Sequence, residues 1–355
     1  MQSIPVTYAK TLKPKPADES KLGFGKLFTD HMLIMDYEPA KGWHDMRIVP
    51  YGDFSMDPAT VVFHYGQAIF EGMKCFRGDG DTIRMFRPRA NFERMNEGGV
   101  RMSMPPMDVD ACMEGLSRLL DIERDWVPRS PGTSLYIRPT IIATDVGLGV
   151  HASANYRFFI ILSPSGAYYA SGLAPVDIYV EDELVRAVRG GIGFTKAAAN
   201  YAASLYAGQA AHQKGYAQVL WLDGVEQKYV EEVGAMNIMF VFGDKVVTPM
   251  LNGSILSGIT RNSILQLASD MGYTIEEKRV PMQEVLEGAR NGTLTEAFGT
   301  GTAAVVSPVG AFSWKGEKVP VGNGGIGEVT QKLYDTLTGI QRGELADPYG
   351  WTVSL

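Results

Sequence analysis

Apolar residues recur at helical spacing in two stretches of the chain, 108–124 and 259–271. In the second stretch, positions i, i+3, i+4 and i+7 are Ile264, Leu267, Ala268 and Met271. This spacing places them on one face of an α-helix, so an amphipathic helix is predicted in each stretch. The alanine-rich segment 197–213 and the segment after Pro88 predict two more helices.

Short runs of β-branched and aromatic residues predict strands between these helices. The predicted strands are 31–37, 61–64, 133–145, 156–164, 176–181, 217–222, 227–231, 236–242, 294–298 and 303–307. Strands and helices mix without a strict strand–helix–strand alternation. The order therefore favours a mixed α/β (α+β) fold over a doubly wound sheet.

One segment, "SPSGAYYASGLAP" at 163–175, interrupts this pattern with Gly, Ser and Pro. Such a composition is typical of a linker. We expect a smaller N-terminal α/β domain at 1–165, an interdomain loop at 166–176 and a larger C-terminal α/β domain at 177–355. A chain of 355 residues is long enough for two such domains.

Charge and composition narrow the class of partner. The formal net charge of −7 gives no general attraction to nucleic acid or to anionic membranes. Two cysteines far apart in sequence, Cys75 and Cys112, make a disulfide framework or a zinc site unexpected. The first 20 residues lack the apolar core of a secretory signal and predict a flexible arm. A cytoplasmic protein that binds small molecules is expected, with no metal.

The stretch "GGIGFTKAAANYAASL" holds one lysine, Lys196, among small and apolar residues, with no acid within five positions. Burial of a lysine favours its neutral amine, which can form a Schiff base with a carbonyl. The small neighbours would leave room for a flat cofactor. The alternative is a surface lysine ahead of a helix, with the glycines forming a turn.

Two glycine-containing segments could bind an anion. "LSGIT" opens the helix at 259–271, where free backbone N–H groups and the helix dipole favour a phosphate, and Thr260 could add a hydroxyl. The run from Gly299 to Thr302 could bring backbone amides and hydroxyls close to a ligand. A capped surface helix and a tight turn are the alternatives.

Four charged residues stand in unusual surroundings. Glu231 and Glu232 are adjacent, so in a strand they point to opposite faces, and one could meet a protonated pyridine nitrogen while the other faces solvent. Arg94 lies in a predicted helix and Arg138 in an apolar strand, where each could bind an oxyanion. Solvent-exposed acids and structural ion pairs are the alternatives. Together, these groups suit pyridoxal 5′-phosphate (PLP).

The chain resembles the branched-chain amino acid aminotransferases, which are fold type IV PLP enzymes with a two-domain, D-amino acid aminotransferase-like fold. The resemblance rests on nine segments in order: "FGKLFTDHM", "HYGQAIFEGMK", "FRPRANFERM", "YIRP", "GAYY", "TKAAANY", "EVGAMN", "LNGSILSGITR" and "FGTGTA". It implies transfer of the amino group of leucine, isoleucine or valine to 2-oxoglutarate, amino acids and 2-oxo acids as partners, and a homodimer.

The resemblance also implies a role for each matched residue. Lys196 would bond the cofactor, Glu232 would hold the ring nitrogen protonated, and Tyr201 would contact the ring oxygen. The phosphate would be bound by Arg94, the amides of Ile259 and Thr260, and Thr302. The substrate pocket would be lined, in part from the partner subunit, by Phe24, Tyr65, Phe70, Tyr136 and Tyr168. Arg138 would receive the glutamate side-chain carboxylate, and Thr302 with Ala303 would hold the α-carboxylate.

The chain departs from the family pattern in two places. Ala235 stands where the family often has threonine, which removes one hydroxyl near the cofactor. Ala304 and Ser307 stand where mammalian members have a redox pair of cysteines, so thiol-based regulation there is excluded. A D-amino acid aminotransferase, an aminodeoxychorismate lyase and a non-catalytic small-molecule binding protein are the alternative functions.

Overall fold

The computed structural model describes residues 4–166 and 173–355. The chain forms two compact units. The first unit comprises Met1–Ala170, Thr195–Ala199 and Ile340–Leu355, and the second comprises Ser171–Phe194 and Asn200–Gly339. Each unit contains a sheet with helices, so the expected mixed α/β fold class is confirmed.

An antiparallel sheet forms the first unit. Its strands pair in the order β18-β5-β4-β6-β7-β1-β2, and β3 pairs with a further part of β6. The strands are β1 (His31–Glu38), β2 (Gly42–Pro50), β3 (Ala68–Phe70), β4 (Met73–Arg77), β5 (Ile83–Phe86), β6 (Ser134–Ala143), β7 (Tyr156–Ser165) and β18 (Thr352–Ser354). The helices are α1 (Val61–Tyr65), α2 (Pro88–Arg101) and α3 (Val109–Ile122), with 3-10 turns at Glu19–Lys21, Asp79–Asp81 and Arg124–Trp126.

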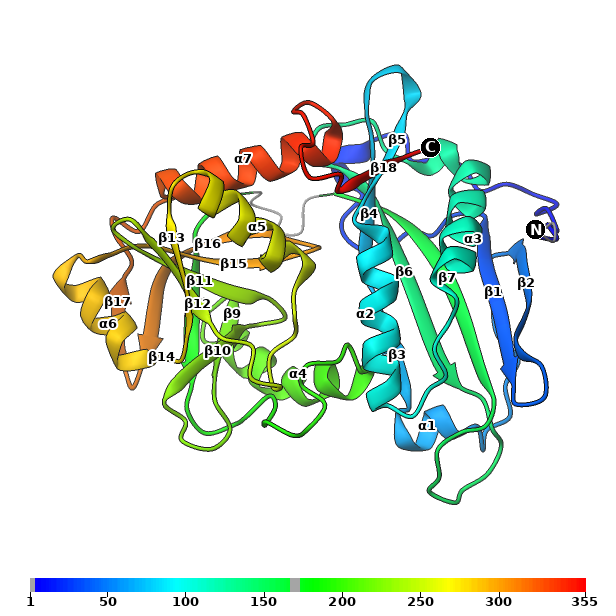
Figure 1. Ribbon diagram of the computed structural model, residues 1–355, viewed down its shortest axis with the longest axis horizontal. Coiled ribbons are helices and arrows are strands. Elements are labelled where there is room, and N and C mark those ends of the chain that lie inside the picture. Colours follow the sequence, from blue (N-terminus) through cyan, green and yellow to red (C-terminus); the bar gives the residue numbers. More distant parts are fainter. Residues whose placement is uncertain (1–3, 167–172) are drawn as a thin grey trace. The chain divides into compact units, whose positions relative to one another are not determined.

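Helices α2 and α3 lie side by side against this sheet (Figure 1). Asp108 caps α3, because its carboxylate accepts from the backbone N–H groups of Asp110 and Ala111. Gly115 allows α3 to approach β1 closely, since a Cβ there would lie 2.7 Å from Leu33 Cδ1. The predicted helix at 108–124 is therefore confirmed, with its apolar face on the sheet.

A mixed sheet forms the second unit, in the order β13-β12-β11-β15-β16-β8-β9-β10-β14, with β17 paired to β16. The strands are β8 (Val176–Glu181), β9 (Gln218–Leu222), β10 (Tyr229–Val233), β11 (Asn237–Phe242), β12 (Lys245–Pro249), β13 (Thr274–Lys278), β14 (Val280–Pro281), β15 (Leu294–Gly301), β16 (Val305–Trp314) and β17 (Glu317–Pro320). The helices are α4 (Ala198–Gln213), α5 (Ile259–Asp270), α6 (Met282–Asn291) and α7 (Glu328–Arg342); the first residues of α4 and the last residues of α7 belong to the first unit. Helices α5 and α6 both contact β15 (Figure 1).

The predicted strand at 61–64 is wrong, because this segment forms α1. Gly66 ends the helix in a left-handed conformation (φ 61°), and its N–H donates to the Val62 carbonyl. The Val61 N–H donates to the carbonyl of Asp145 at 2.8 Å. This distant contact replaces the strand partner that a short apolar run suggests.

The N-terminal arm, expected to be flexible, is bound to the first unit over its described residues. Its backbone pairs with Ile48, and the Ala9 N–H donates to His31 Nε2 at 2.9 Å. The Lys13 N–H donates to the Asp30 carboxylate at 2.7 Å. The prediction failed because these partners lie on or directly before two strands, β1 and β2, and no local pattern in the arm shows them.

The units differ from the expected domain boundaries in two places. The strand pairing of Ile69 with Ala197 joins Thr195–Ala199, and with it Lys196, to the first unit. Pairing of β18 with β5 joins Ile340–Leu355 to the same unit. Within the described residues, both cysteines are free and buried, and no helix is long and apolar enough to cross a membrane.

Candidate active site

The backbone around Lys196 is held by two elements of the first unit. The Phe70 N–H donates to the Lys196 carbonyl at 3.1 Å, next to the pairing of Ile69 with Ala197. Helix α2 lies close on another side, since a Cβ at Gly98 would lie 3.4 Å from Thr195 Cβ. The lysine is thus placed by sheet pairing rather than by a solvent-exposed turn.

The Phe70 ring carries two cations. Lys196 Nζ lies 4.8 Å from the ring centroid, and Arg138 Cζ lies 4.6 Å from the same centroid. Both distances are within the range of cation–π attraction. The structure therefore brings Lys196 and Arg138, two of the predicted site residues, to a third, Phe70.

Two more predicted residues join this group. Arg138 Nη2 donates to the Tyr136 hydroxyl at 3.3 Å, and the rings of Tyr136 and Phe24 meet edge to face at 4.8 Å. Gly72 makes room for Tyr136, because a Cβ there would lie 2.0 Å from the hydroxyl oxygen. An aromatic wall with one arginine at its edge results.

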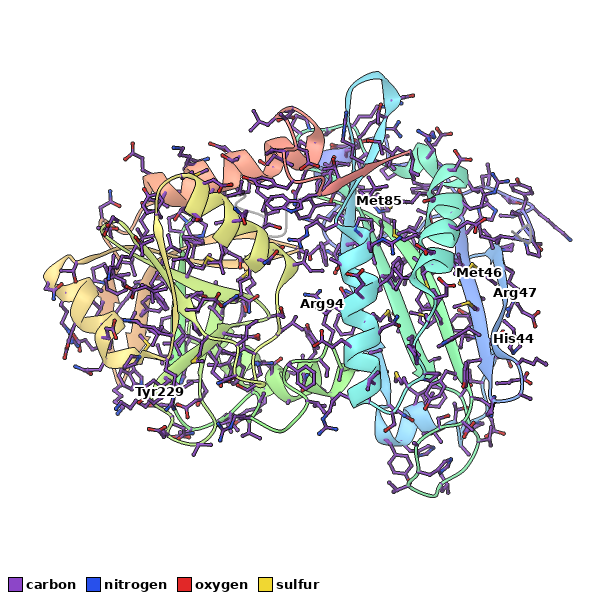
Figure 2. All side chains as sticks on the ribbon, viewed as in Figure 1. His44, Met46, Arg47, Met85, Arg94 and Tyr229 are labelled. Carbon is purple, nitrogen blue, oxygen red and sulfur yellow. The ribbon has the colours of Figure 1, made fainter. Side chains whose placement is uncertain are left out.

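Arg94 projects from α2 and pairs with a glutamate that the sequence analysis did not single out (Figure 2). Arg94 Nε and Nη2 donate to Glu71 Oε1 and Oε2, each at 2.8 Å. The ion pair considered as an alternative for Arg94 is therefore present. Its role toward a phosphate stays a prediction.

In the second unit, Glu232 accepts one hydrogen bond and forms one ion pair. Its Oε1 accepts from the Leu256 N–H at 2.8 Å, and its Oε2 lies 3.2 Å from Arg186 Nε. The guanidinium of Arg186 also donates to the Ser254 carbonyl. A buried carboxylate needs such a cationic neighbour, and this neighbour lies 46 positions away in sequence.

Alternation along a strand would let one of Glu231 and Glu232 face solvent, but both side chains are buried, with exposed fractions of 3% and 4%. The pairing of β10 with β9 shifts register between Val230 and Glu232, and a bulge of this kind breaks the alternation of faces. Glu231 accepts from the Ser254 hydroxyl. Burial raises the pKa of Glu231, and this hydrogen bond opposes the shift.

The N-terminus of α5 is positioned by a side chain of β11. Asn237 Nδ2 donates to the Leu256 carbonyl at 2.9 Å, and a Cβ at Gly258 would lie 2.0 Å from Asn237 Oδ1. Gly258 precedes the helix in an extended conformation and supplies no side-chain cap. Ile259 and Thr260, the predicted phosphate-binding residues, begin α5 as its first two residues.

The glycines before Lys196 also have a packing role in the second unit. A Cβ at Gly193 would lie 2.3 Å from the Ser254 carbonyl oxygen, so only glycine fits there. Ser254 thereby contacts Gly193, Arg186 and Glu231. The predicted glycine turn before Lys196 is present, but close packing against Ser254 explains why Gly193 is a glycine.

The turn after β15 contains Thr302 and Ala303, both half-buried. Directly after the turn, Val305 has φ 62°, a conformation that costs a β-branched residue about 1–3 kcal/mol. In the described part of the chain, the buried Thr300 Oγ1 has no hydrogen-bond partner. An oxyanion beside this turn would supply one.

Three predicted residues remain. Tyr201 is half-buried in α4. Tyr65 ends α1, is 41% exposed and donates its hydroxyl to the Leu148 carbonyl. Tyr168 lies outside the described residues, together with most of the expected interdomain loop.

Known proteins match the chain over almost its whole length. "Branched-chain-amino-acid aminotransferase 2" of Bacillus subtilis is 53% identical over 100% of this chain and 97% of its own. A probable branched-chain-amino-acid aminotransferase of Staphylococcus epidermidis is 57% identical over 98% of this chain and 96% of its own. The solved structure of the Escherichia coli branched-chain amino acid aminotransferase matches with a TM-score of 0.77 and 28% identity, over 91% of this chain and 98% of that one.

These matches confirm the resemblance and the fold type IV architecture that the sequence motifs implied. A family model described as amino-transferase class IV covers residues 68–312, a span that contains Lys196, Arg94, Arg138 and Glu232. Since the family model and the full-length relatives agree, the chain belongs to the class IV aminotransferase family.

Proposed function

We propose that the chain is a branched-chain amino acid aminotransferase that uses PLP. One observation carries the proposal: Lys196 and Arg138 lie over the same Phe70 ring, 4.8 and 4.6 Å from its centroid. A lysine beside an apolar aromatic wall suits leucine, isoleucine or valine. An arginine at the edge of that wall suits the side-chain carboxylate of glutamate or 2-oxoglutarate.

The donor set fits PLP. Lys196 supplies the amine for the aldehyde, and the buried carboxylate of Glu232 suits a protonated ring nitrogen. Tyr201 would contact the ring oxygen, and the phosphate would be bound by Arg94, Thr302 and the first turn of α5, where Ile259 and Thr260 lie. When bound, this cofactor acts as an electron sink that makes a substrate Cα proton removable.

The protein's own groups supply the remaining chemistry. Lys196 Nζ would take the proton from the substrate Cα as general base, hold it as an ammonium group, and donate it as general acid to the carbon on the far side of the substrate nitrogen, two bonds from Cα. Phe24, Phe70 and Tyr136 would exclude water from the apolar side chain. Thr302 and Ala303 would hold the α-carboxylate. Because one site serves both amino acid and 2-oxo acid, ping-pong kinetics are expected.

The first test is the absorbance spectrum of the purified protein with PLP, before and after addition of L-leucine. A visible band that L-leucine shifts, with release of the 2-oxo acid, would support the proposal. A band that responds only to D-alanine would assign the chain to the D-amino acid aminotransferases. A response only to aminodeoxychorismate would assign it to the lyases. Absence of a borohydride-stable label on Lys196 would favour a binding protein.

The Arg138→Ala variant should separate the two substrates. Loss of the guanidinium removes a charge-assisted contact worth about 1.5–3 kcal/mol, so we expect kcat/KM for 2-oxoglutarate to fall about 10- to 100-fold. The value for L-leucine should fall far less, because its side chain has no carboxylate. Steady-state kinetics with both substrates measure the difference.

Arg157→Ala is the matched control, because Arg157 also stands on the same sheet with its Cζ 5.3 Å from a phenylalanine ring, that of Phe54. This variant should leave kcat/KM unchanged for both 2-oxoglutarate and L-leucine. Equal losses for both substrates in Arg138→Ala would contradict the assigned role.

We also propose that the protein is a homodimer that buries an apolar patch of the first unit. The exposed side chains of the patch are Phe63, Tyr65, Val146, Leu148 and Val150. Backbone pairing of Thr60 with Val146 and the Tyr65–Leu148 hydrogen bond hold them together. A patch of this kind supports a protein interface.

A charge in the patch should break the dimer. Leu148 is 67% exposed, so Leu148→Glu should fold normally and sediment as a monomer, whereas the wild type sediments as a dimer. Val225→Glu, at an 81% exposed position of the second unit, should remain dimeric. A dimeric Leu148→Glu variant, or a monomeric wild type, would refute the proposed interface.

A further inference from the structure

Glu71 of the first unit is fully buried, with an exposed fraction of 0%. Both of its oxygens accept from Arg94, at 2.8 Å each, and Oε2 also accepts from the Gly72 N–H at 3.1 Å. A buried carboxylate with this many donors is held in one orientation. The plane of the Arg94 guanidinium is fixed with it.

Glu71 occupies the centre of a three-residue segment that contacts three predicted site residues. Phe70 donates its N–H to the Lys196 carbonyl and lies under Lys196 Nζ. Glu71 pairs with Arg94. Gly72 leaves the space that the Tyr136 hydroxyl fills. Residues 70–72 therefore link the lysine, the arginine of α2 and the aromatic wall.

The geometry of the Glu71–Arg94 ion pair indicates its role. Arginine has five N–H donors in one plane, and Glu71 accepts from two of its nitrogens, Nε and Nη2, so the carboxylate fixes that plane. Holding the guanidinium by one edge removes its rotamer freedom before a second anion binds. A buried ion pair alone adds little to stability after desolvation, so stability gives no sufficient reason for it.

We propose that Glu71 is a positioning residue that orients Arg94 toward the phosphate of the cofactor. The inference rests on the proposed function, since it takes Arg94 as a phosphate ligand. It assigns to Glu71 a role in binding the phosphate and none in bonding the aldehyde. Glu71 acts through Arg94 and does not itself touch the cofactor.

The experiment compares two ligands that differ only in the phosphate. Apoprotein is titrated with PLP and with pyridoxal, and equilibrium binding is followed by absorbance. We expect Glu71→Gln to weaken PLP binding about tenfold and to change pyridoxal binding by less than about twofold, because only PLP uses Arg94. Glu71→Asp, which keeps the charge but shortens the reach, should give a smaller loss for PLP alone.

Glu123→Gln is the matched control. Glu123 is also buried in the first unit, and it pairs with His31 on β1. The same isosteric change should leave the affinities for both ligands unaltered. Melting temperature and near-ultraviolet circular dichroism of each variant report the fold, and Glu71→Asp carries the test if Glu71→Gln does not fold.

Three outcomes would overturn the inference. Equal losses for PLP and pyridoxal would mean that Glu71 supports the Lys196 segment generally. Unchanged PLP binding would mean that the ion pair is irrelevant to the phosphate. Tighter PLP binding in Glu71→Gln would mean that the carboxylate competes with the phosphate for Arg94. A wild-type protein that binds no PLP would remove the proposed function as well, which distinguishes that failure from these three.

Discussion

Replacing Lys196 by alanine is expected to abolish transamination between L-leucine and 2-oxoglutarate. The amine serves twice in the proposed chemistry, as the group that bonds the cofactor and as the base that moves the Cα proton. General acid–base catalysis alone contributes about 10²- to 10⁴-fold, so kcat should fall by about 10³-fold or more. A coupled assay of glutamate formation measures the loss.

The surroundings of Lys196 predict that the variant keeps its fold. The strand pairing at Ile69 and the Phe70 hydrogen bond use only the backbone of residues 196 and 197, which alanine retains. Lys214→Ala is the control, because Lys214 Nζ also lies over an aromatic ring, 4.4 Å from the centroid of Tyr179, on the exposed side of the second unit. It should retain full activity. Near-normal turnover in Lys196→Ala would contradict the proposed function as a whole.

The sequence predicted elements whose information is local. Helix α3 has its cap, its apolar face and its end within 15 residues, and its boundaries were predicted to within about two residues. The same holds for the start of α5 at Ile259. Lys196 stood out because its neighbours in sequence are small, and neighbours in sequence are visible without a structure.

Partners distant in sequence could not be found in this way. Glu71 and Arg94 are 23 positions apart, and Arg186 and Glu232 are 46 apart. Neither spacing corresponds to a helical or strand period, so no pattern joins them. The only sequence signal for Glu71 was its place inside the motif "HYGQAIFEGMK", which carries no contact information.

Irregular backbone accounts for the wrong expectations at 61–64 and at Glu231. The side chains of a strand alternate between its two faces only while the register is regular. The register shifts between Val230 and Glu232, and the two successive glutamates there are both buried. At 61–64, the segment forms a helical turn, and the Val61 N–H donates to the carbonyl of Asp145, a partner distant in sequence.

Glu232→Gln is expected to lower kcat for the leucine half-reaction by about 10²- to 10³-fold, the range for removal of a preorganised charged contact. In the proposed function, this carboxylate holds a proton on the ring nitrogen, and a neutral amide cannot. Arg186 supports that task, because its Nε lies 3.2 Å from Glu232 Oε2 and its charge offsets the cost of burying a carboxylate. Stopped-flow absorbance with L-leucine measures the rate.

A direct measurement of the ring nitrogen distinguishes this role from a structural one. With ¹⁵N-labelled PLP, the nitrogen resonance of the wild type should lie at the protonated position, and that of Glu232→Gln should move toward the neutral position. Glu231→Gln is the matched control, since Glu231 is adjacent, equally buried and bonded to Ser254. The Glu231→Gln variant should keep the nitrogen resonance at the protonated position and should keep most of the wild-type kcat. An equal fall in kcat for both variants, with the nitrogen resonance unchanged in each, would mean that the two glutamates share a packing role. The partner of the ring nitrogen would then be another residue.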